Sequence, residues 1–188
     1  EIHIQYVGPS IQYTPLNNGL IGELAVQMAI YKKDSIINSD AYRLKTPFMV
    51  DSIIDDFYDI KRFALEPGNY QVALIIQDLN SKNDPINTSF AVNVEAFDDV
   101  LSLSDIIVAE SASPSNEDSP FFKSGYTILP RISTYYPAEL TNMPAYFEIY
   151  NMNELEDSVF GLKQTIIHAE TGQELEKLTR FSRHSTDV

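Results

Sequence analysis

Apolar residues recur at every second position in three stretches between residues 24 and 96. The three sets are Leu24-Val26-Met28-Ile30, Tyr70-Val72-Leu74-Ile76 and Phe90-Val92-Val94-Ala96. A period of two places alternate side chains on one face of a β-strand. Residues 78–85, which separate the last two sets, are rich in Asp, Asn, Ser and Pro. The pattern therefore predicts three strands, the last two joined as a hairpin with an exposed tip.

A local motif before the second strand sharpens this interpretation. Residues 65–70 read Leu-Glu-Pro-Gly-Asn-Tyr. Pro67 presets its φ for a turn, and Gly68 supplies the positive φ that a type II turn needs. Tyr70 then suits a tyrosine corner, in which the hydroxyl bonds back to the turn backbone. The alternative is an ordinary turn with an aromatic residue nearby, and we favour the corner because a hairpin follows.

A second unit is predicted to begin near Asp98-Asp99. Residues 101–108 are predicted to open it as a strand, Ser111 to Pro120 form a loop, and further strands are expected at 126–129, 145–150 and 162–169. Thr171-Gly172 makes a turn, and residues 173–181 suit either a strand or a short helix. Short strands between turn residues predict an all-β protein of two tandem antiparallel β-sandwich domains, immunoglobulin-like or fibronectin-III-like. We expect them at residues 1–98 and 99–188, the second either complete or truncated at its C-terminus.

Charge and composition narrow the range of partners. Lys and Arg number 13 against 27 Asp and Glu, a net charge of −14, which disfavours nucleic acid and anionic membrane surfaces. No apolar run approaches the about 18 residues of a membrane span. Cysteine is absent, which excludes disulfides, thiol catalysis and cysteine-ligated metals. The sequence opens at Glu1 without a targeting segment. We therefore expect either a chain from which a targeting segment has been removed or a fragment of a longer protein, and we favour the fragment.

Histidines and glycines give no catalytic motif. His3, His168 and His184 lie in different regions and form no zinc-binding helix pattern. We expect His168 on a sheet surface and His184 near a frayed C-terminus. No nucleophile elbow, P-loop or dinucleotide motif is present, and a Ser/His/Asp triad has no local support. We therefore predict no catalytic, cofactor-binding or metal residue, no cofactor, and no enzymatic activity.

Acidic residues gather in three places that a hard cation could use. The groups are Asp51, Asp55, Asp56 and Asp59; Glu154, Glu156 and Asp157; and the loop from Asp78 to Asp84. Calcium takes six to eight oxygen ligands, commonly from acids at alternating positions with a glycine at the turn. The first group lacks that pattern and the Asp78 loop fits it slightly better. Solvated loop charges are the favoured interpretation in each case.

Aromatic residues offer a possible contact surface. Tyr135-Tyr136 is one candidate, and alternation puts Tyr146, Glu148 and Tyr150 on one strand face with Phe147 and Ile149 on the other. Two interpretations stay open: a protein-contact face, or tyrosines that cover a second core layer. The absence of Trp weakens a glycan-binding interpretation. Asn87-Thr88-Ser89 matches the N-glycosylation triplet, but one such match is expected by chance in a chain of this length.

The order of several short motifs resembles a known family. The motifs are Phe63-Ala-Leu-Glu-Pro-Gly-Asn-Tyr-Gln-Val, Asp78-Leu-Asn-Ser, Leu101-Ser-Leu-Ser-Asp-Ile, Ser124-Gly-Tyr-Thr-Ile-Leu-Pro-Arg and Tyr146-Phe-Glu-Ile-Tyr-Asn. Over residues 55–155 this succession resembles the β-rich region of GWxTD-domain proteins, which are envelope-associated and mostly uncharacterised proteins of Bacteroidetes. The Gly-Trp-x-Thr-Asp motif itself is absent. The resemblance implies two tandem immunoglobulin-like sandwiches on the exported side of a bacterial membrane, and it carries over no catalytic residue.

These observations predict a non-catalytic interaction or scaffold module of an exported bacterial multidomain protein. We expect a protein partner of unidentified nature, no nucleic acid and no membrane insertion by this segment, and a periplasmic or cell-surface location. The alternative is a ligand-binding module for glycan or calcium in a cell-envelope protein. A hydrolase is a third, weaker hypothesis.

Overall fold

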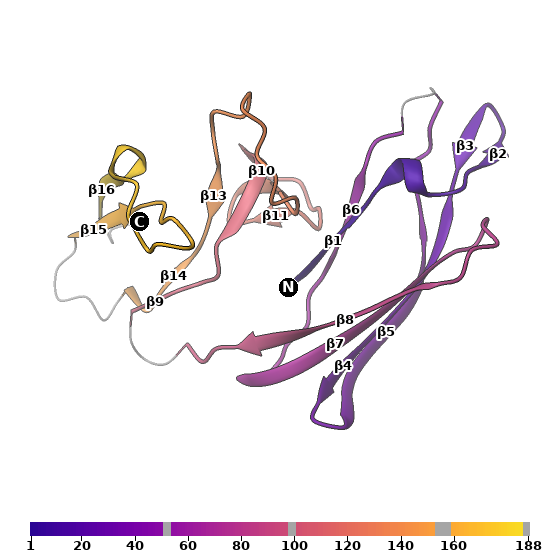
Figure 1. Ribbon diagram of the computed structural model, residues 1–188, viewed down its shortest axis with the longest axis horizontal. Coiled ribbons are helices and arrows are strands. Elements are labelled where there is room, and N and C mark those ends of the chain that lie inside the picture. Colours follow the sequence, from indigo (N-terminus) through magenta and orange to yellow (C-terminus); the bar gives the residue numbers. More distant parts are fainter. Residues whose placement is uncertain (51–53, 98–100, 153–158, 186–188) are drawn as a thin grey trace. The chain divides into compact units, whose positions relative to one another are not determined.

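The computed structural model describes residues 1–50, 54–97, 101–152 and 159–185. The regular secondary structure of these residues consists mainly of β-strands (Figure 1). The helical segments that it describes are short 3₁₀ turns, among them η1 (Gly8–Ser10) and η3 (Glu176–Leu178). The predicted all-β fold class is confirmed. Within the described residues, no helix has the length and apolar character needed to cross a lipid bilayer.

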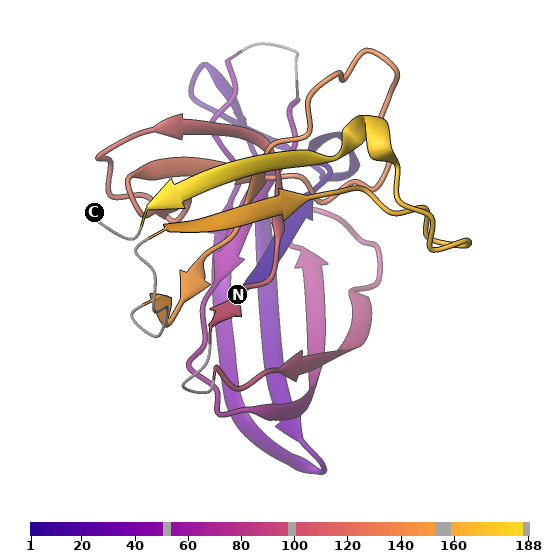
Figure 2. The same ribbon diagram turned by 90° about the vertical axis from the view of Figure 1, so that its left-hand side faces the viewer.

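The largest sheet holds all three predicted strands and has the order β5-β4-β7-β8, with each neighbouring pair antiparallel. Its members are β4 (Glu23–Lys32), β5 (Ser35–Lys45), β7 (Gly68–Asp78) and β8 (Ile86–Val94). They run side by side as the long indigo-to-magenta strands of Figure 2. The predicted hairpin is confirmed, since β7 pairs with β8 across the turn at residues 79–85.

A two-stranded layer covers part of one face of this sheet. It consists of β1 (Ile2–Tyr6) and β6 (Phe57–Lys61), which pair antiparallel. Ile4, Tyr6 and Phe57 from this layer form one core cluster with the alternate apolar residues of β4 and β7. Tyr6 stacks on Phe57 with 5.0 Å between ring centroids. A small hairpin of β2 (Thr14–Leu16) and β3 (Gly19–Ile21) follows β1 in the chain.

The predicted tyrosine corner is present at the start of β7. The Tyr70 hydroxyl donates a hydrogen bond of 2.7 Å to the carbonyl oxygen of Glu66. Gly68 has a φ of +147°, which L-residues rarely adopt, so a side chain at this position would be strained. The hydrogen bond of the corner formed as predicted because Tyr70 and Glu66 are close in the chain, whereas the φ of Gly68 differs from the about +80° of the type II turn that we predicted.

Residues 107–146 form a second four-stranded sheet of order β11-β12-β10-β13. Its strands are β10 (Ile107–Pro114), β11 (Phe122–Lys123), β12 (Tyr126–Pro130) and β13 (Ala145–Tyr146). The predicted loop from Ser111 to Pro120 is therefore wrong in its first part, because β10 pairs with β12 as far as Pro114. The ladder is made by backbone groups, so this exposed strand end needs no apolar residues.

Two compact units emerge from the contact pattern: Glu1–Ala96 with Ile107–Tyr146, and Phe97–Ile106 with Phe147–Val188. In the second unit, β9 (Ser102–Leu103) pairs with β14 (Ile149–Tyr150), and β15 (Val159–Gln164) pairs with β16 (Arg180–Ser185). Asp98 and Asp99, where we placed the boundary, lie outside the described residues. The division into two tandem sandwiches stays a prediction.

Three other strand predictions need correction. Residues 101–108 are not one strand, since β9 ends at Leu103 and β10 begins at Ile107. Residues 145–150 are likewise split, into β13 and β14. The strand expected at 162–169 lies at Val159–Gln164, and residues 173–181 contain η3 followed by the start of β16. The turn at Thr171-Gly172 is confirmed by a φ of +68° at Gly172 and its hydrogen bond to His168.

Candidate interaction surface

The inner face of the large sheet is the face that packs against β1 and β6. Its apolar side chains are buried on β4 and become progressively more exposed toward β8. One cross-strand row joins Ile30, Val72 and Phe90, whose exposed fractions are 1 %, 1 % and 38 %. A second row joins Val26, Ile76 and Ile86, in which Val26 is fully buried and Ile86 is 67 % exposed. The apolar pattern thus continues across the sheet beyond the side chains that cover it.

β8 is also an edge strand, since the sheet order ends there and no described strand pairs with its outer side. Its sequence, Ile-Asn-Thr-Ser-Phe-Ala-Val-Asn-Val, contains no charged residue and no proline. Its pairing with β7 runs from Gly68↔Val94 to Ile76↔Ile86 without a register shift. Natural proteins guard sheet edges with charges, prolines or bulges, because an open edge offers unpaired backbone donors and acceptors to another strand.

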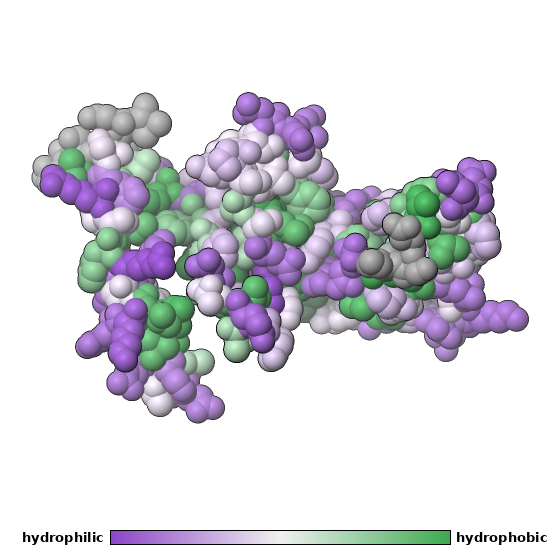
Figure 3. Space-filling model, turned by 90° about the horizontal axis from the view of Figure 1, so that it is seen from above, coloured by the Kyte–Doolittle hydropathy of each residue, from purple (hydrophilic) through white to green (hydrophobic). Residues whose placement is uncertain are grey.

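The opposite edge of the same sheet is guarded. β5 carries Asp40, Arg43 and Lys45, and its pairing with β4 contains a register shift between Ile30 and Tyr31. Apolar residues reach the surface in many places, as the green areas of Figure 3 show, and single exposed apolar residues are normal. What distinguishes β8 is the combination of exposed apolar side chains with an unguarded backbone edge.

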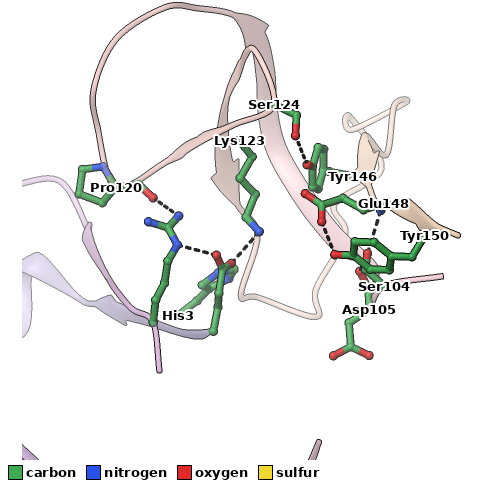
Figure 4. A network of polar contacts seen from close by, with 11 residues as sticks. His3, Ser104, Asp105, Pro120, Lys123, Ser124, Tyr146, Glu148 and Tyr150 are labelled. Atoms are coloured by element: carbon green, nitrogen blue, oxygen red, sulfur yellow. Dashed lines mark hydrogen bonds and ion pairs between the residues drawn. The ribbon is translucent and has the colours of Figure 1, made fainter. Parts of the chain in front are cut away.

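Polar clusters elsewhere in the first unit tie segments together. The Glu1 carboxylate accepts hydrogen bonds from Arg62 Nε at 2.6 Å and lies 2.9 Å from Lys123 Nζ and 3.2 Å from His3 Nε2 (Figure 4). Arg62 Nη2 also donates to the carbonyl oxygen of Pro120 at 2.6 Å. Partial burial alone would raise the pKa of Glu1, but the bonds from Arg62, Lys123 and His3 outweigh it and lower the pKa to about 2. The cluster joins the start of β1 to β6 and β11.

A second cluster links the covering layer to the sheet. The Tyr42 hydroxyl, on β5, donates a short hydrogen bond to Asp59 on β6. Lys61 Nζ lies 3.4 Å from the Tyr42 ring centroid and 3.2 Å from Asp40. Burial, together with the hydrogen bond to Asp59, raises the pKa of Tyr42 well above its usual range. Burial likewise raises the pKa of Tyr6 to about 12. Both phenols therefore stay protonated at neutral pH, and that of Tyr42 donates to Asp59.

The three histidines do not meet. His3 borders a small hollow that Ile60 and Phe121 also line. His168 is exposed beyond the end of β15, so its placement on a sheet surface is wrong: Gly172 closes a turn on its backbone there. His184 lies within β16, where its ring stacks on Phe160 with centroids 5.4 Å apart, and the C-terminal residues 186–188 are outside the described residues.

The acidic groups bind donors from the protein itself. Asp56 accepts from Gln5 Nε2 at 2.7 Å and from the Gly8 backbone at 3.0 Å. Asp78 accepts from the backbone N–H groups of Gln12 and Asn80 at 2.7 and 2.9 Å. In the parts of the chain that the structure describes, no three His, Asp or Glu side chains lie close enough to hold a metal. Asp51, Glu154, Glu156 and Asp157 lie outside the described residues.

The residues of the predicted aromatic face lie in two short strands instead of one. Tyr146 closes the first unit in β13, where its hydroxyl lies 3.3 Å from Ser124 Oγ, whereas Tyr150 belongs to β14 of the second unit and donates to Glu148. The strand break at residues 147–148 interrupts the alternation on which the prediction rested. Tyr135 is 72 % exposed, as a contact residue would be, and Arg131 lies 4.8 Å from the ring centroid of Tyr136.

The sequence pattern predicts β8 as a strand but does not single it out as a surface. The alternation of Phe90, Val92 and Val94 places these residues on one strand face and does not show whether that face is covered. The signal that was available is the absence of charge from Ile86 to Val94 in a chain whose net charge is −14. Asn87, Thr88 and Ser89, noted as a glycosylation triplet, lie exposed on this strand.

Comparison of the chain with protein-family models, with curated proteins and with solved structures found no match. The resemblance to GWxTD-domain proteins therefore has no support beyond the order of the motifs, and the geometry described above carries the functional argument.

Proposed function

We propose that this chain is a non-catalytic interaction module that binds an extended strand along the edge of β8. The observation that carries the proposal is the unguarded edge itself, in which a charge-free strand leaves Ile86 67 % exposed and Phe90 38 % exposed. In strand addition, main-chain hydrogen bonds supply affinity, and pockets or patches for alternate side chains supply specificity. Both components are available along β8.

The inner-face residues of β8 would recognise the apolar side chains of the added strand. Val92 and Val94 are partly buried against the core, so they extend the apolar surface from β7 to the edge. A strand added here would continue the sheet and cover Phe90, which at the edge has no apolar neighbour on its outer side among the described strands. Burial of apolar area contributes roughly 25 cal/mol per Å².

The wider context of this proposal is a scaffold part of an exported bacterial multidomain protein, in the periplasm or at the cell surface. This placement rests on the order of motifs that resembles the β-rich region of GWxTD-domain proteins, since no composition or site feature specifies a compartment. The negative charge of the chain is compatible with a protein partner and disfavours nucleic acid.

A fluorescent peptide probe tests the binding mode. The probe is a strand-length peptide of alternating Val and Thr with a lysine at each end, and its anisotropy is followed as the protein is titrated. We expect saturable binding that Phe90→Lys weakens by about tenfold or more, because a charge at an exposed edge opposes strand pairing. Gln71→Lys is the matched control: it adds the same charge to an exposed position of β7 and should leave binding unchanged. Absence of saturable binding at concentrations where the chain is monomeric, or equal loss in both variants, would overturn the proposal.

A further inference from the structure

The β8 edge is self-complementary. Consider two copies of β8 that pair antiparallel about a two-fold axis through Phe90. A residue a given number of positions before Phe90 then lies opposite the residue the same number of positions after Phe90 in the other copy. Phe90 then faces Phe90 of the other copy, Thr88 faces its Val92, and Ile86 faces its Val94. All of these side chains lie on the inner face, because β8 alternates and these positions share one parity.

The outer-face residues match equally well in this register. Asn87 lies opposite Asn93 of the other copy, and Ser89 lies opposite its Ala91. No charged residue is therefore paired on either face, and the exposed Phe90 and Ile86 are covered by apolar residues of the other copy. Cross-strand pairs of this kind stabilise antiparallel sheets, whereas like charges placed opposite one another destabilise them.

We propose that the partner of β8 is a second copy of this chain, which forms a two-fold dimer with one continuous sheet of eight strands in the order β5-β4-β7-β8-β8-β7-β4-β5. This inference rests on the proposed function, because it uses the same edge and names its occupant. The opposite edge is a poorer partner: β5 carries Asp40, Arg43 and Lys45. Pairing of β8 with β5 of another copy would moreover be heterologous and would leave open ends, whereas β8 with β8 closes.

Charge also distinguishes this contact from the rest of the surface. The chain carries a net charge of −14, so two copies repel one another in general, yet the nine residues of β8 contribute no charge. The repulsion is reduced further where the salt concentration is high. At the ends of the paired strands, Asp84 of one copy comes near Glu95 of the other in this register. We therefore expect the dimer to strengthen between roughly 0.05 and 0.5 M salt, over which the screening length falls severalfold.

Engineered cysteines test the register directly, since the natural chain contains none. Residues directly opposite in an antiparallel pair have Cα atoms about 4.5–5.5 Å apart, within the range that a disulfide spans. Under mild oxidation, Phe90→Cys should form a covalent dimer, because position 90 alone lies opposite itself. Thr88→Cys should not, but the double variant Thr88→Cys/Val92→Cys should, and this variant keeps Phe90. Gln71→Cys is the control for random collisions.

Sedimentation velocity over a range of protein concentrations measures the assembly itself. We expect a reversible dimer whose dissociation constant rises about tenfold or more in Phe90→Lys and is unchanged in Gln71→Lys. Circular dichroism of each variant checks that the fold is kept. A chain that stays monomeric at all concentrations and salt levels, without cross-linking at position 90, would overturn the dimer. If the Val/Thr peptide still binds β8 in that case, the proposed function stands and only its partner is wrong.

Discussion

β4 and β8 belong to the same sheet and show the same alternation of apolar and polar residues, but they differ in what lies over them. The inner-face residues of β4 are packed under Ile4, Tyr6 and Phe57 of the β1–β6 layer. Those of β8 extend past this layer, and Ile86 and Phe90 remain exposed. Alternation thus specifies which side chains share a face, whereas the position of a strand within the sheet decides whether that face is covered.

The two strands therefore have different consequences for the protein. β4 pairs with β5 on one side and β7 on the other, so its backbone groups are used within the fold. β8 pairs only with β7 in the described structure, which leaves one side of its backbone and part of its apolar face for another chain. The first strand contributes stability, and the second is the place where we propose recognition.

The strongest test of this contrast compares the same substitution in both strands. Ile30→Ala removes a buried side chain and should lower the free energy of unfolding by about 2–5 kcal/mol. Ile86→Ala, on the edge, should change it by less than about 0.5 kcal/mol at concentrations where the protein is monomeric. Urea unfolding followed by circular dichroism, with unchanged m-values, measures both. Similar losses in the two variants would show that β8 is covered after all.

A second test weakens the attachment of the β1–β6 layer to the sheet and leaves the strands of the sheet unchanged. Tyr42→Phe removes the hydroxyl that donates to Asp59 and so links β5 to β6. Because a part-buried carboxylate then lacks its hydrogen-bond donor, the free energy of unfolding should fall by about 1–3 kcal/mol. Tyr58→Phe is the matched control, because its hydroxyl bonds to Glu110 at 3.2 Å in an exposed position and should cost much less. If both variants unfold at the same urea concentration, the Tyr42–Asp59 link does not hold the cover in place.

The tyrosine corner provides a smaller effect at the junction between covered and uncovered regions, since Tyr70 lies at the start of β7 opposite Val92 of β8. Tyr70→Phe keeps the buried ring and removes the bond to Glu66. We expect a loss of about 1 kcal/mol in the free energy of unfolding. Hydrogen exchange of the Glu66–Tyr70 turn should quicken before that of β4 does. An unchanged stability would mean that the ring alone, without its hydroxyl, fixes the turn.

The features that could be predicted from the sequence are those set by neighbouring residues. The alternation of β4 and β7, the β7–β8 hairpin and the Tyr70 corner all depend on contacts within a few positions. The extent of β10 could not be predicted in this way. Its C-terminal end contains Ser and Pro and is part of the strand because it pairs with residues 126–129 of another strand. Polar residues in an exposed strand leave no apolar period to detect.

The candidate surface was hidden for a related reason. Phe90, Val92 and Val94 have the pattern of a core strand, and only the tertiary arrangement shows that the β1–β6 layer does not reach them fully. The break at residues 147–148 within the strand predicted at 145–150 likewise has no signal in the local alternation. For β8 the missing information was a contact between distant segments.

The smallest expected effect concerns the pH dependence of the covering layer. The pKa of Glu1 is about 2 in the folded protein and 4.5 is its ordinary value, so between these values the unfolded chain binds more protons than the folded one. The stability that Glu1 contributes is therefore fully present above pH 4.5 and is lost as the pH falls toward 2. Glu1→Gln should be less stable than the natural chain near neutral pH, and the difference should shrink in acid. A difference that stays constant across this range would show that Arg62 and Lys123 do not hold the covering layer through the Glu1 charge.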